Sequence, residues 1–150
     1  MLKIGDKAPD FKLTADDGKI YSLKDFKGKK IILYFYPKDM TSGCTSEACD
    51  FRDNIKLFQK KNSIVIGVSK DNIESHKKFK LKYNLPFTLM SDENMDMLKA
   101  YDVWKEKSMY GKKYMGIERT TYIIDEKGVI KEIFRKVKVK GHIEEILNKI

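Results

Sequence analysis

The chain has 150 residues, of which 31 are Lys or Arg and 22 are Asp or Glu, so its formal net charge is +9. Apolar residues make up 41% and charged residues 35%, a globular composition that excludes a disordered chain. The length predicts a single domain over residues 1–150. The longest apolar run, 31–36, is far shorter than the ~20 residues that cross a bilayer, so we expect no membrane association.

The N-terminus carries no apolar stretch typical of a signal peptide, which favours a cytoplasmic location. Two cysteines cannot build a disulfide scaffold or a four-cysteine zinc site. Inside a reducing compartment, two nearby cysteines more often serve chemistry than a permanent crosslink. The cysteine pair is therefore the first candidate for a functional site.

The positive charge comes almost entirely from lysine, because Arg52, Arg119 and Arg135 are the only arginines. Lysine alone is poorly suited to bidentate recognition of bases or phosphates. The densest lysine tracts are interleaved with apolar residues at helix or strand spacing. We interpret the charge as a solvated surface, with no nucleic-acid partner expected. A lysine-rich nucleic-acid-binding module is the alternative, and a salt-dependent gel shift would favour it.

The first elements of the chain predict a hairpin followed by a buried strand. Residues 10–22 alternate apolar and polar side chains on both sides of an Asp-Gly turn, which is a hairpin signal. A single helical turn is predicted at 23–26. The continuous β-rich apolar run at 30–36 is typical of a strand that is covered on both faces.

A helix–strand–helix segment follows. Apolar residues at spacings of three and four predict a helix over 43–61. Residues 63–69 predict a second buried strand. Residues 72–83 predict a lysine-rich amphipathic helix with Asp71 as its N-cap.

The last third of the chain predicts shorter elements. Residues 86–90 are predicted to be extended, and a turn then leads into a helix that ends near Tyr101. Residues 103–115 have no clear period and are predicted to form a loop. Residues 120–137 predict a second hairpin, and 141–150 predict a terminal helix.

This order of elements predicts an α/β fold. The early strand–helix–strand units imply parallel strands with right-handed crossovers, and the late hairpin adds antiparallel strands. The expected architecture is a mixed central β-sheet flanked by helices on both faces, with an N-terminal β-hairpin.

Cys44 follows the strand predicted at 30–36 and lies in the first turn of the helix predicted over 43–61. Open α/β sheets bind ligands at this place, beyond the carboxyl end of a strand. The free N–H groups and partial positive charge of a helix N-terminus favour a thiolate over a thiol. Cys44 is also in phase with Ala48 and the other apolar residues of the helix. Its sulfur is therefore predicted to point into the protein body.

Cys49 lies five residues further along, about 140° around an intact helix and about 8–9 Å away between Cα atoms. A disulfide needs about 4.4–6.8 Å, so the sulfurs can bond only if the first helical turns unwind. We interpret the pair as a two-state redox element. The alternatives are two unrelated buried cysteines, or half of a metal site. A metal site is disfavoured because His76 and His142 occupy separate lysine-rich segments, where each is expected at the surface.

Several segments together resemble the peroxiredoxin family. Residues 37–44 fit its Pro-x-x-x-Thr-x-x-Cys signature. Cys44 and Cys49 have the Cys-x4-Cys spacing of the bacterioferritin comigratory protein (peroxiredoxin Q) subfamily. Residues 116–122 resemble its arginine-bearing strand, and 5–11 resemble its opening segment. The resemblance covers nearly the whole chain.

The resemblance implies a thioredoxin-like fold and an antioxidant, thiol-specific peroxidase that reduces hydrogen peroxide and organic hydroperoxides. By position, Cys44 would be the peroxidatic nucleophile and Cys49 the resolving thiol, while Thr41, Arg119 and Pro37 would complete the pocket. A sulfenic acid at Cys44 would be resolved as an intramolecular disulfide. Thioredoxin is the implied electron donor, no metal or organic cofactor is implied, and the subfamily is often monomeric.

Thiol ionisation alone does not supply the required rate. Ionising a thiol nearly completely at pH 7, instead of to about 3%, gains about 30-fold. The accompanying loss of intrinsic nucleophilicity costs about tenfold if peroxide attack behaves like disulfide exchange. Preorganised donors at the departing oxygen can each be worth about 10²–10³. We therefore expect Arg119, Thr41 and backbone N–H groups near Cys44 to supply most of the acceleration.

Two other redox functions share part of this chemistry. A dithiol–disulfide oxidoreductase would share the fold, but it would carry Cys-x-x-Cys instead of Cys-x4-Cys. A redox sensor that passes its oxidation to a partner would use the same chemistry, and the sequence leaves it open. Arg119 also has an alternative interpretation, a surface ion pair with Glu47 or Glu118.

Overall fold

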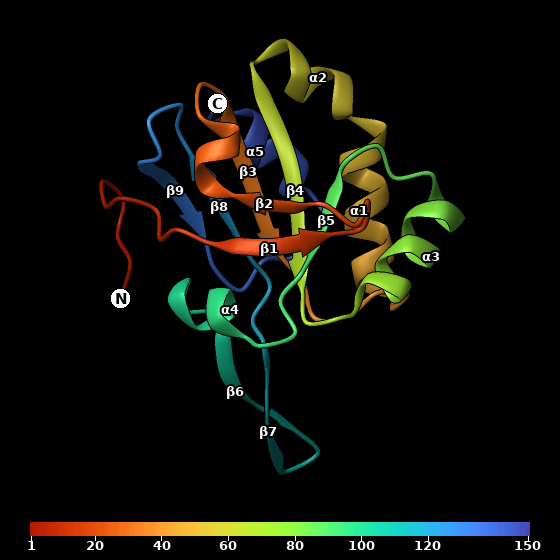
Figure 1. Cartoon of the computed structure of the whole chain (residues 1–150). Coiled ribbons are helices and arrows are strands. Elements are labelled where there is room, and N and C mark those ends of the chain that lie inside the picture. The colour runs from red at the N-terminus through yellow and green to blue at the C-terminus, as the bar shows by residue number, and fades with distance from the viewer.

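The computed structural model describes residues 1–150 and contains nine β-strands, five α-helices and one 3-10 helix (Figure 1). In chain order these are β1 (Lys12–Ala15), β2 (Ile20–Ser22), η1 (Leu23–Phe26), β3 (Lys30–Phe35), α1 (Ser42–Asp53), α2 (Ile55–Lys60), β4 (Ser63–Ser69), α3 (Ile73–Tyr83), β5 (Thr88–Ser91), α4 (Asp96–Ala100), β6 (Trp104–Met109), β7 (Lys112–Ile117), β8 (Thr120–Ile124), β9 (Ile130–Phe134) and α5 (His142–Leu147).

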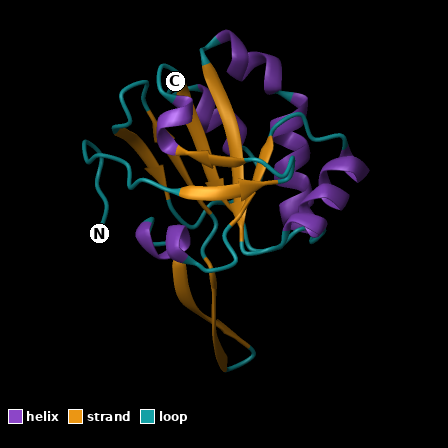
Figure 2. Ribbon diagram, viewed as in Figure 1, coloured by secondary structure: helices purple, strands orange, loops and turns teal.

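Seven strands form one mixed sheet in the order β2-β1-β5-β4-β3-β8-β9 (Figure 2). β3, β4 and β5 are mutually parallel, whereas β1, β2, β8 and β9 join through antiparallel pairs. Helical connections join the parallel strands: α1 and α2 lie between β3 and β4, and α3 lies between β4 and β5. The element order predicts this arrangement. The predicted mixed sheet with an N-terminal hairpin is confirmed.

β3 is buried on both faces, and its alternating side chains enter two separate cores. Ile31, Leu33 and Phe35 pack into one core together with α4 and the N-terminal segment. Ile32 and Tyr34 enter the other core, which also contains apolar side chains from α1, α2, α3 and α5. The sheet is therefore covered by helices on both faces, as expected. None of the helices combines the length and the apolar character needed to cross a membrane.

The helix predicted over 43–61 is two helices, α1 and α2, with a break at Asn54. The Asn54 side chain donates from Nδ2 to the Asp50 carbonyl at 2.8 Å, and its backbone leaves the helical region at φ −116° and ψ 11°. Asn and Asp side chains compete with the backbone for such hydrogen bonds and disfavour helix interiors. The predicted N-cap of α3 is also wrong, since Asn72 accepts from Ser75 N at 2.9 Å and Asp71 makes other contacts.

The predicted loop at 103–115 is instead an antiparallel hairpin, β6–β7, with its own register and no bond to the main sheet. Figure 1 shows the hairpin projecting away from the body of the molecule. The turn residues Tyr110 and Gly111 both have positive φ, 52° and 78°, as a tight hairpin turn requires. The strands lack an apolar–polar alternation because most of their side chains are exposed on both faces.

Gly67 on β4 allows a close approach of the layers around Tyr34. A Cβ atom at this position would lie 2.9 Å from Leu89 Cδ2 and 2.9 Å from Tyr34 Cζ. Tyr34 in turn stacks on Phe51 of α1, with ring centroids 4.6 Å apart. A side chain at position 67 would therefore disturb the contact that seats α1.

We expect Gly67→Ala to lower the free energy of unfolding by about 1–3 kcal/mol through overpacking. Urea denaturation of the reduced protein measures the loss. If Leu89 is a clashing partner, Gly67→Ala in a Leu89→Ala background should cost less than the sum of the two single losses. Unchanged stability of Gly67→Ala would show that the site relaxes without strain.

Candidate active site

Cys44 lies where the sequence predicts it, in the first turn of α1 just beyond the carboxyl end of β3. Its side chain is 1% exposed and packs into the core beneath α1 together with Ala48 and Phe51. Cys49 lies on the same helix and is half-buried. Both cysteines are unpaired, and α1 is whole between them. The chain thus has the helical, dithiol arrangement in which the two sulfurs are held apart.

Arg119 lies between β7 and β8 and spans the gap to α1. Its Nη2 donates to Cys44 Sγ at 3.3 Å, and its Nη1 donates to Glu47 Oε1 at 2.7 Å. Gly43 permits this approach, because a Cβ there would lie 3.3 Å from the same Nη2. The predicted contact between Arg119 and Cys44 and the alternative pairing with Glu47 are both present. A fixed guanidinium fork can serve both partners at once.

Glu47 is 1% exposed, and its second carboxylate oxygen, Oε2, has no hydrogen-bond partner. Burial raises the pKa of Glu47 to about 7, and the opposing attraction of Arg119 limits the rise. Burial also acts to lower the pKa of Arg119, but the charges of Glu47 and Cys44 outweigh it and raise that pKa. The guanidinium therefore keeps its charge between two groups that both gain from it.

Thr41 occupies the N-cap position of α1, yet its side chain makes no capping hydrogen bond. Its hydroxyl donates to the Lys38 carbonyl at 2.8 Å, and the residue is exposed. With its hydrogen engaged, the hydroxyl oxygen offers lone pairs to a hydroperoxide O–H rather than a donor to the departing oxygen. Pro37 is half-buried at the start of the same loop and contributes no N–H.

A buried polar network holds the loop between β3 and α1, and the sequence did not reveal it. The Asp39 carboxylate is 4% exposed and accepts from Tyr36 Oη at 2.6 Å and Ser75 Oγ at 2.8 Å. His76 Nδ1 lies 2.7 Å from the same carboxylate. The Asp39 backbone N–H donates to Asp71 Oδ2 at 2.8 Å. These contacts fasten the loop that precedes Cys44 to α3 and to the end of β4.

The predicted surface location of His76 is wrong, since this histidine is fully buried, with 0% of its surface exposed. Nε2 faces the Met90 carbonyl at 2.9 Å, which can only accept, so Nε2 carries a hydrogen. Nδ1 faces a carboxylate that already accepts from two hydroxyl groups, so it carries a hydrogen as well. Burial acts to lower the pKa of His76, but the Asp39 hydrogen bond and charge outweigh it and raise that pKa. The raised pKa of His76 favours its protonated form beside Asp39.

His142 is also buried rather than exposed, at 1%. Its Nε2 lies 2.7 Å from Thr121 Oγ1 and its Nδ1 lies 2.6 Å from Glu145 Oε1. Burial lowers the pKa of His142 although Glu145 opposes the shift. Both histidines stand in lysine-rich segments, and only the packing of those helices on the sheet determines that they face inward.

One group of side chains has the spacing of a metal site, since ligand atoms of Asp39, Asp71 and His76 lie within 4.8 Å of one another. All of these atoms already hydrogen-bond within the protein. Asp71 Oδ2 accepts from Ser69 Oγ at 2.7 Å as well as from the Asp39 N–H. A cation would have to displace these bonds, so the group is better described as a structural clamp on the loop.

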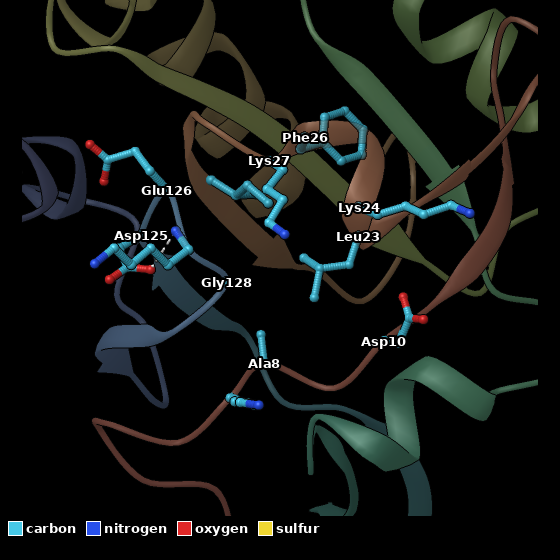
Figure 3. Close-up of a pocket in the computed structure, with 12 residues that line it drawn as sticks. Ala8, Asp10, Leu23, Lys24, Phe26, Lys27, Asp125, Glu126 and Gly128 are labelled. Atoms are coloured by element: carbon cyan, nitrogen blue, oxygen red, sulfur yellow. Dashed lines mark hydrogen bonds between the residues drawn. The ribbon is translucent and has the colours of Figure 1, made fainter.

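A separate surface pocket lies at the other end of β3 (Figure 3). Side chains from the N-terminal segment, η1 and the β8–β9 turn line it, among them Ala8, Leu23, Phe26 and Ile31. Ile31 stands near the start of β3, whereas Cys44 follows its end. The full length of the strand therefore separates this pocket from the thiol, and it contributes nothing to the cysteine site.

A thioredoxin-like α/β sheet with a buried helical cysteine beneath an arginine defines a thiol-based oxidoreductase. Residues 4–133 match the AhpC/TSA family, and the chain belongs to that family. It is 52% identical over 149 residues to the putative peroxiredoxin bcp of Coxiella burnetii, which is 99% of each chain. It is 54% identical over 146 residues to the peroxiredoxin Bcp of Bacillus subtilis, covering 97% of this chain and 93% of the relative.

Solved structures give the same result. A mutant of Xylella fastidiosa PrxQ matches with a TM-score of 0.94 and 39% identity, covering 99% of this chain and 95% of the other. The Xanthomonas campestris bacterioferritin comigratory protein, studied for its alkyl peroxide reduction activity, matches with a TM-score of 0.88 and 39% identity over 92% of this chain and 88% of the other. The predicted fold and the predicted class of enzyme, a thiol peroxidase, are confirmed.

Replacing Glu47 by Gln tests the buried carboxylate through the pH dependence of stability. The pKa of Glu47 is about 7 in the folded chain, above its ordinary value of 4.5. As the pH rises the unfolded state ionises first, so stability is lost between pH 4.5 and about 7. Glutamine keeps an acceptor for Arg119 but does not ionise. By pH 8 the wild type should therefore have lost about 3 kcal/mol more than Glu47→Gln, counted from pH 4.5.

Urea denaturation of both reduced proteins at several pH values between 4.5 and 8 measures this difference. The histidines titrate in both proteins and cancel in the comparison. Parallel stability curves would contradict a buried, ionisable Glu47.

Proposed function

We propose that Cys44 is the peroxidatic nucleophile with which this thiol peroxidase reduces hydrogen peroxide and organic hydroperoxides. The observation that carries the proposal is the 3.3 Å hydrogen bond from Arg119 Nη2 to Cys44 Sγ in a buried site. A cationic donor aimed at sulfur favours the thiolate, which is the reactive form. The alkyl peroxide reduction activity studied for the Xanthomonas campestris relative supports the same substrate class.

In the first step, the Cys44 thiolate attacks one peroxide oxygen, so that an S–O bond forms while the O–O bond breaks. The departing oxygen takes a proton and leaves as water or an alcohol, and Cys44 becomes a sulfenic acid. Negative charge moves from sulfur to the departing oxygen. Arg119 already lies beside the sulfur. The first N–H groups of α1, which have no partner within the helix, are the other candidate donors. These donors stabilise the transition state more than they stabilise the thiolate.

In the second step, the Cys49 thiol attacks the sulfenic sulfur, a disulfide forms and water leaves. Both cysteines lie on α1, so part of this helix must unwind before the sulfurs meet. Thioredoxin is the proposed reductant: its two thiols open the Cys44–Cys49 disulfide and become a disulfide themselves. The cycle uses no metal or organic cofactor.

The same proposal covers the state of the protein. Residues 1–150 would act as a single peroxiredoxin domain, as a monomer in the cytoplasm. All the side chains that the first step needs, Cys44, Arg119, Thr41 and Pro37, come from one chain. The polar contacts of the cysteine site, such as the 2.7 Å bond from Arg119 to Glu47, are also made within the chain.

Arg119→Ala should slow peroxide reduction by about 10² or more, because it removes a preorganised donor at the site of developing charge. Stopped-flow oxidation of the reduced protein by hydrogen peroxide measures the rate of the first step. Arg135→Ala is the matched control, since Arg135 is a half-buried arginine that bonds Tyr122 Oη at 3.0 Å and no cysteine. Near wild-type rates in Arg119→Ala would remove this residue from the mechanism.

Cys49→Ser should separate the two steps. The variant is expected to consume one equivalent of peroxide and to retain a sulfenic acid at Cys44, because attack on peroxide does not require the second thiol. It should fail to turn over with thioredoxin. Mass spectrometry of the peptide that contains Cys44, with a sulfenic-acid-trapping reagent, detects the intermediate. Sustained turnover with thioredoxin would contradict the resolving role of Cys49.

A further inference from the structure

We propose that one face of the β6–β7 hairpin is the docking surface for the protein reductant, and that its partner is an acidic dithiol protein. The inference rests on the proposed function, because it concerns reduction of the Cys44–Cys49 disulfide. The hairpin is the part of the molecule that projects furthest from the sheet (Figure 1). It also ends at Ile117, two residues before Arg119.

The register of the hairpin divides its side chains between two faces. Lys107 pairs with Tyr114 and Met109 pairs with Lys112, so these four residues share one face, here called the lysine face. The opposite face carries Glu106 with its partner Met115, and Ser108 with its partner Lys113. Both faces are largely solvent-exposed, because the two-stranded sheet has no other layer against it.

The two faces differ in their charge. On the opposite face, Lys113 Nζ lies 3.6 Å from Glu106 Oε1, so that lysine has a carboxylate partner. On the lysine face, neither Lys107 nor Lys112 has a carboxylate within 4.0 Å, whereas Lys105, nearer the base of the hairpin on the same side, pairs with Asp102 at 2.9 Å. Lys107 and Lys112 therefore carry positive charge without a direct carboxylate partner, although the charge of Glu118 acts on Lys107 from further away.

Lys107 connects this face to the reactive sulfur. Its stem packs over Gly116, where a Cβ would lie 3.2 Å from Lys107 Cδ. Burial and the nearby Arg119 charge lower the pKa of Lys107, while Cys44 and Glu118 act in the opposite direction. Its ammonium group is thus close enough to interact with both residues of the cysteine site. A partner bound to the lysine face would lie beside the disulfide that it must reduce.

The lysine face also presents apolar contact area. Met109 is 56% exposed and Tyr114 is 44% exposed, and Tyr110 at the turn is 98% exposed. Aromatic residues and Met are enriched at protein interfaces, where they supply buried area around charged contacts. Three such side chains on a short hairpin with no other layer against it form an exposed apolar patch.

The positive charge of the lysine face determines which kind of partner can bind there. A second copy of this chain would bring another net charge of +9 and another lysine face, so two such faces repel each other. Hydroperoxides are small and reach the sulfur without a docking surface. The remaining participant in the cycle is the protein that donates two thiols. A negatively charged surface around its dithiol would match the lysine face and raise its association rate.

The test compares two charge reversals on adjacent hairpin residues. Lys112→Glu reverses a charge on the lysine face, and Lys113→Glu reverses one on the opposite face. Each protein is first oxidised with one equivalent of hydrogen peroxide. Reduction of its disulfide is then followed with a thioredoxin of negative net charge and, separately, with dithiothreitol. Lys112 takes no part in the proposed peroxide chemistry, so the oxidation step is expected to be unchanged.

We expect Lys112→Glu to lower the second-order rate constant with thioredoxin by about tenfold at low ionic strength, and the difference to shrink in high salt. Lys113→Glu should change the rate by a smaller factor, and both variants should react normally with dithiothreitol. Tyr114→Ala should also slow reduction by thioredoxin, because contact area with the protein is lost. It should leave reduction by dithiothreitol unchanged.

Equal rates for Lys112→Glu and Lys113→Glu with thioredoxin would overturn the docking surface. So would a wild-type dimer that dissociates on Lys112→Glu substitution, because a second copy would then be the occupant. Failure of the wild type to be oxidised by peroxide would instead contradict the proposed function, so the two failures are distinguishable.

Discussion

The site depends on one partly buried cation that two acidic groups share. Arg119 donates to Cys44 Sγ at 3.3 Å and to Glu47 Oε1 at 2.7 Å, and both acceptors belong to α1. The carboxylate fixes the direction of the guanidinium, so its second N–H reaches the sulfur without reorganisation. The arrangement is balanced: burial raises the pKa of Glu47 to about 7, so the ion pair weakens when the carboxyl takes a proton. Positioning of the donor and protonation of Glu47 are therefore linked.

The loop that precedes α1 is held in place more firmly than the first turns of α1 are. Asp39 and His76 form a fully buried pair that fastens the loop to α3, and breaking such a pair on one side costs several kcal/mol. The first turn of α1 has no capping side-chain bond from Thr41. The break at Asn54 separates α1 from α2, so α2 can keep its place while α1 changes. In the proposed cycle, unwinding for disulfide formation would thus be confined to a segment whose two ends are anchored.

Much of the fold and of the site could be predicted from local sequence. Burial of strand β3 follows from its continuous apolar run, and burial of Cys44 follows from its phase with the apolar face of α1. The hairpin β6–β7 could not be found in this way, because exposure on both faces leaves no alternation; the Tyr110-Gly111 turn was the available signal. Burial of His76 was also missed, since it depends on an Asp39 contact 37 residues away in the chain.

The lysines divide into two classes according to their surroundings. Most surface lysines form a solvated surface and have no carboxylate partner, as the composition predicts. Lys107 is different because its stem is packed against Gly116 and its charge adds to that of Arg119 beside the sulfur. Because the charges of Lys107 and Lys112 add to that of Arg119, negatively charged groups gain stability when they approach this edge. In the proposed cycle two negative partners do so at different times: the departing peroxide oxygen, stabilised within the pocket, and the acidic reductant, outside it. Positive charge at this edge of the molecule therefore serves both halves of the reaction.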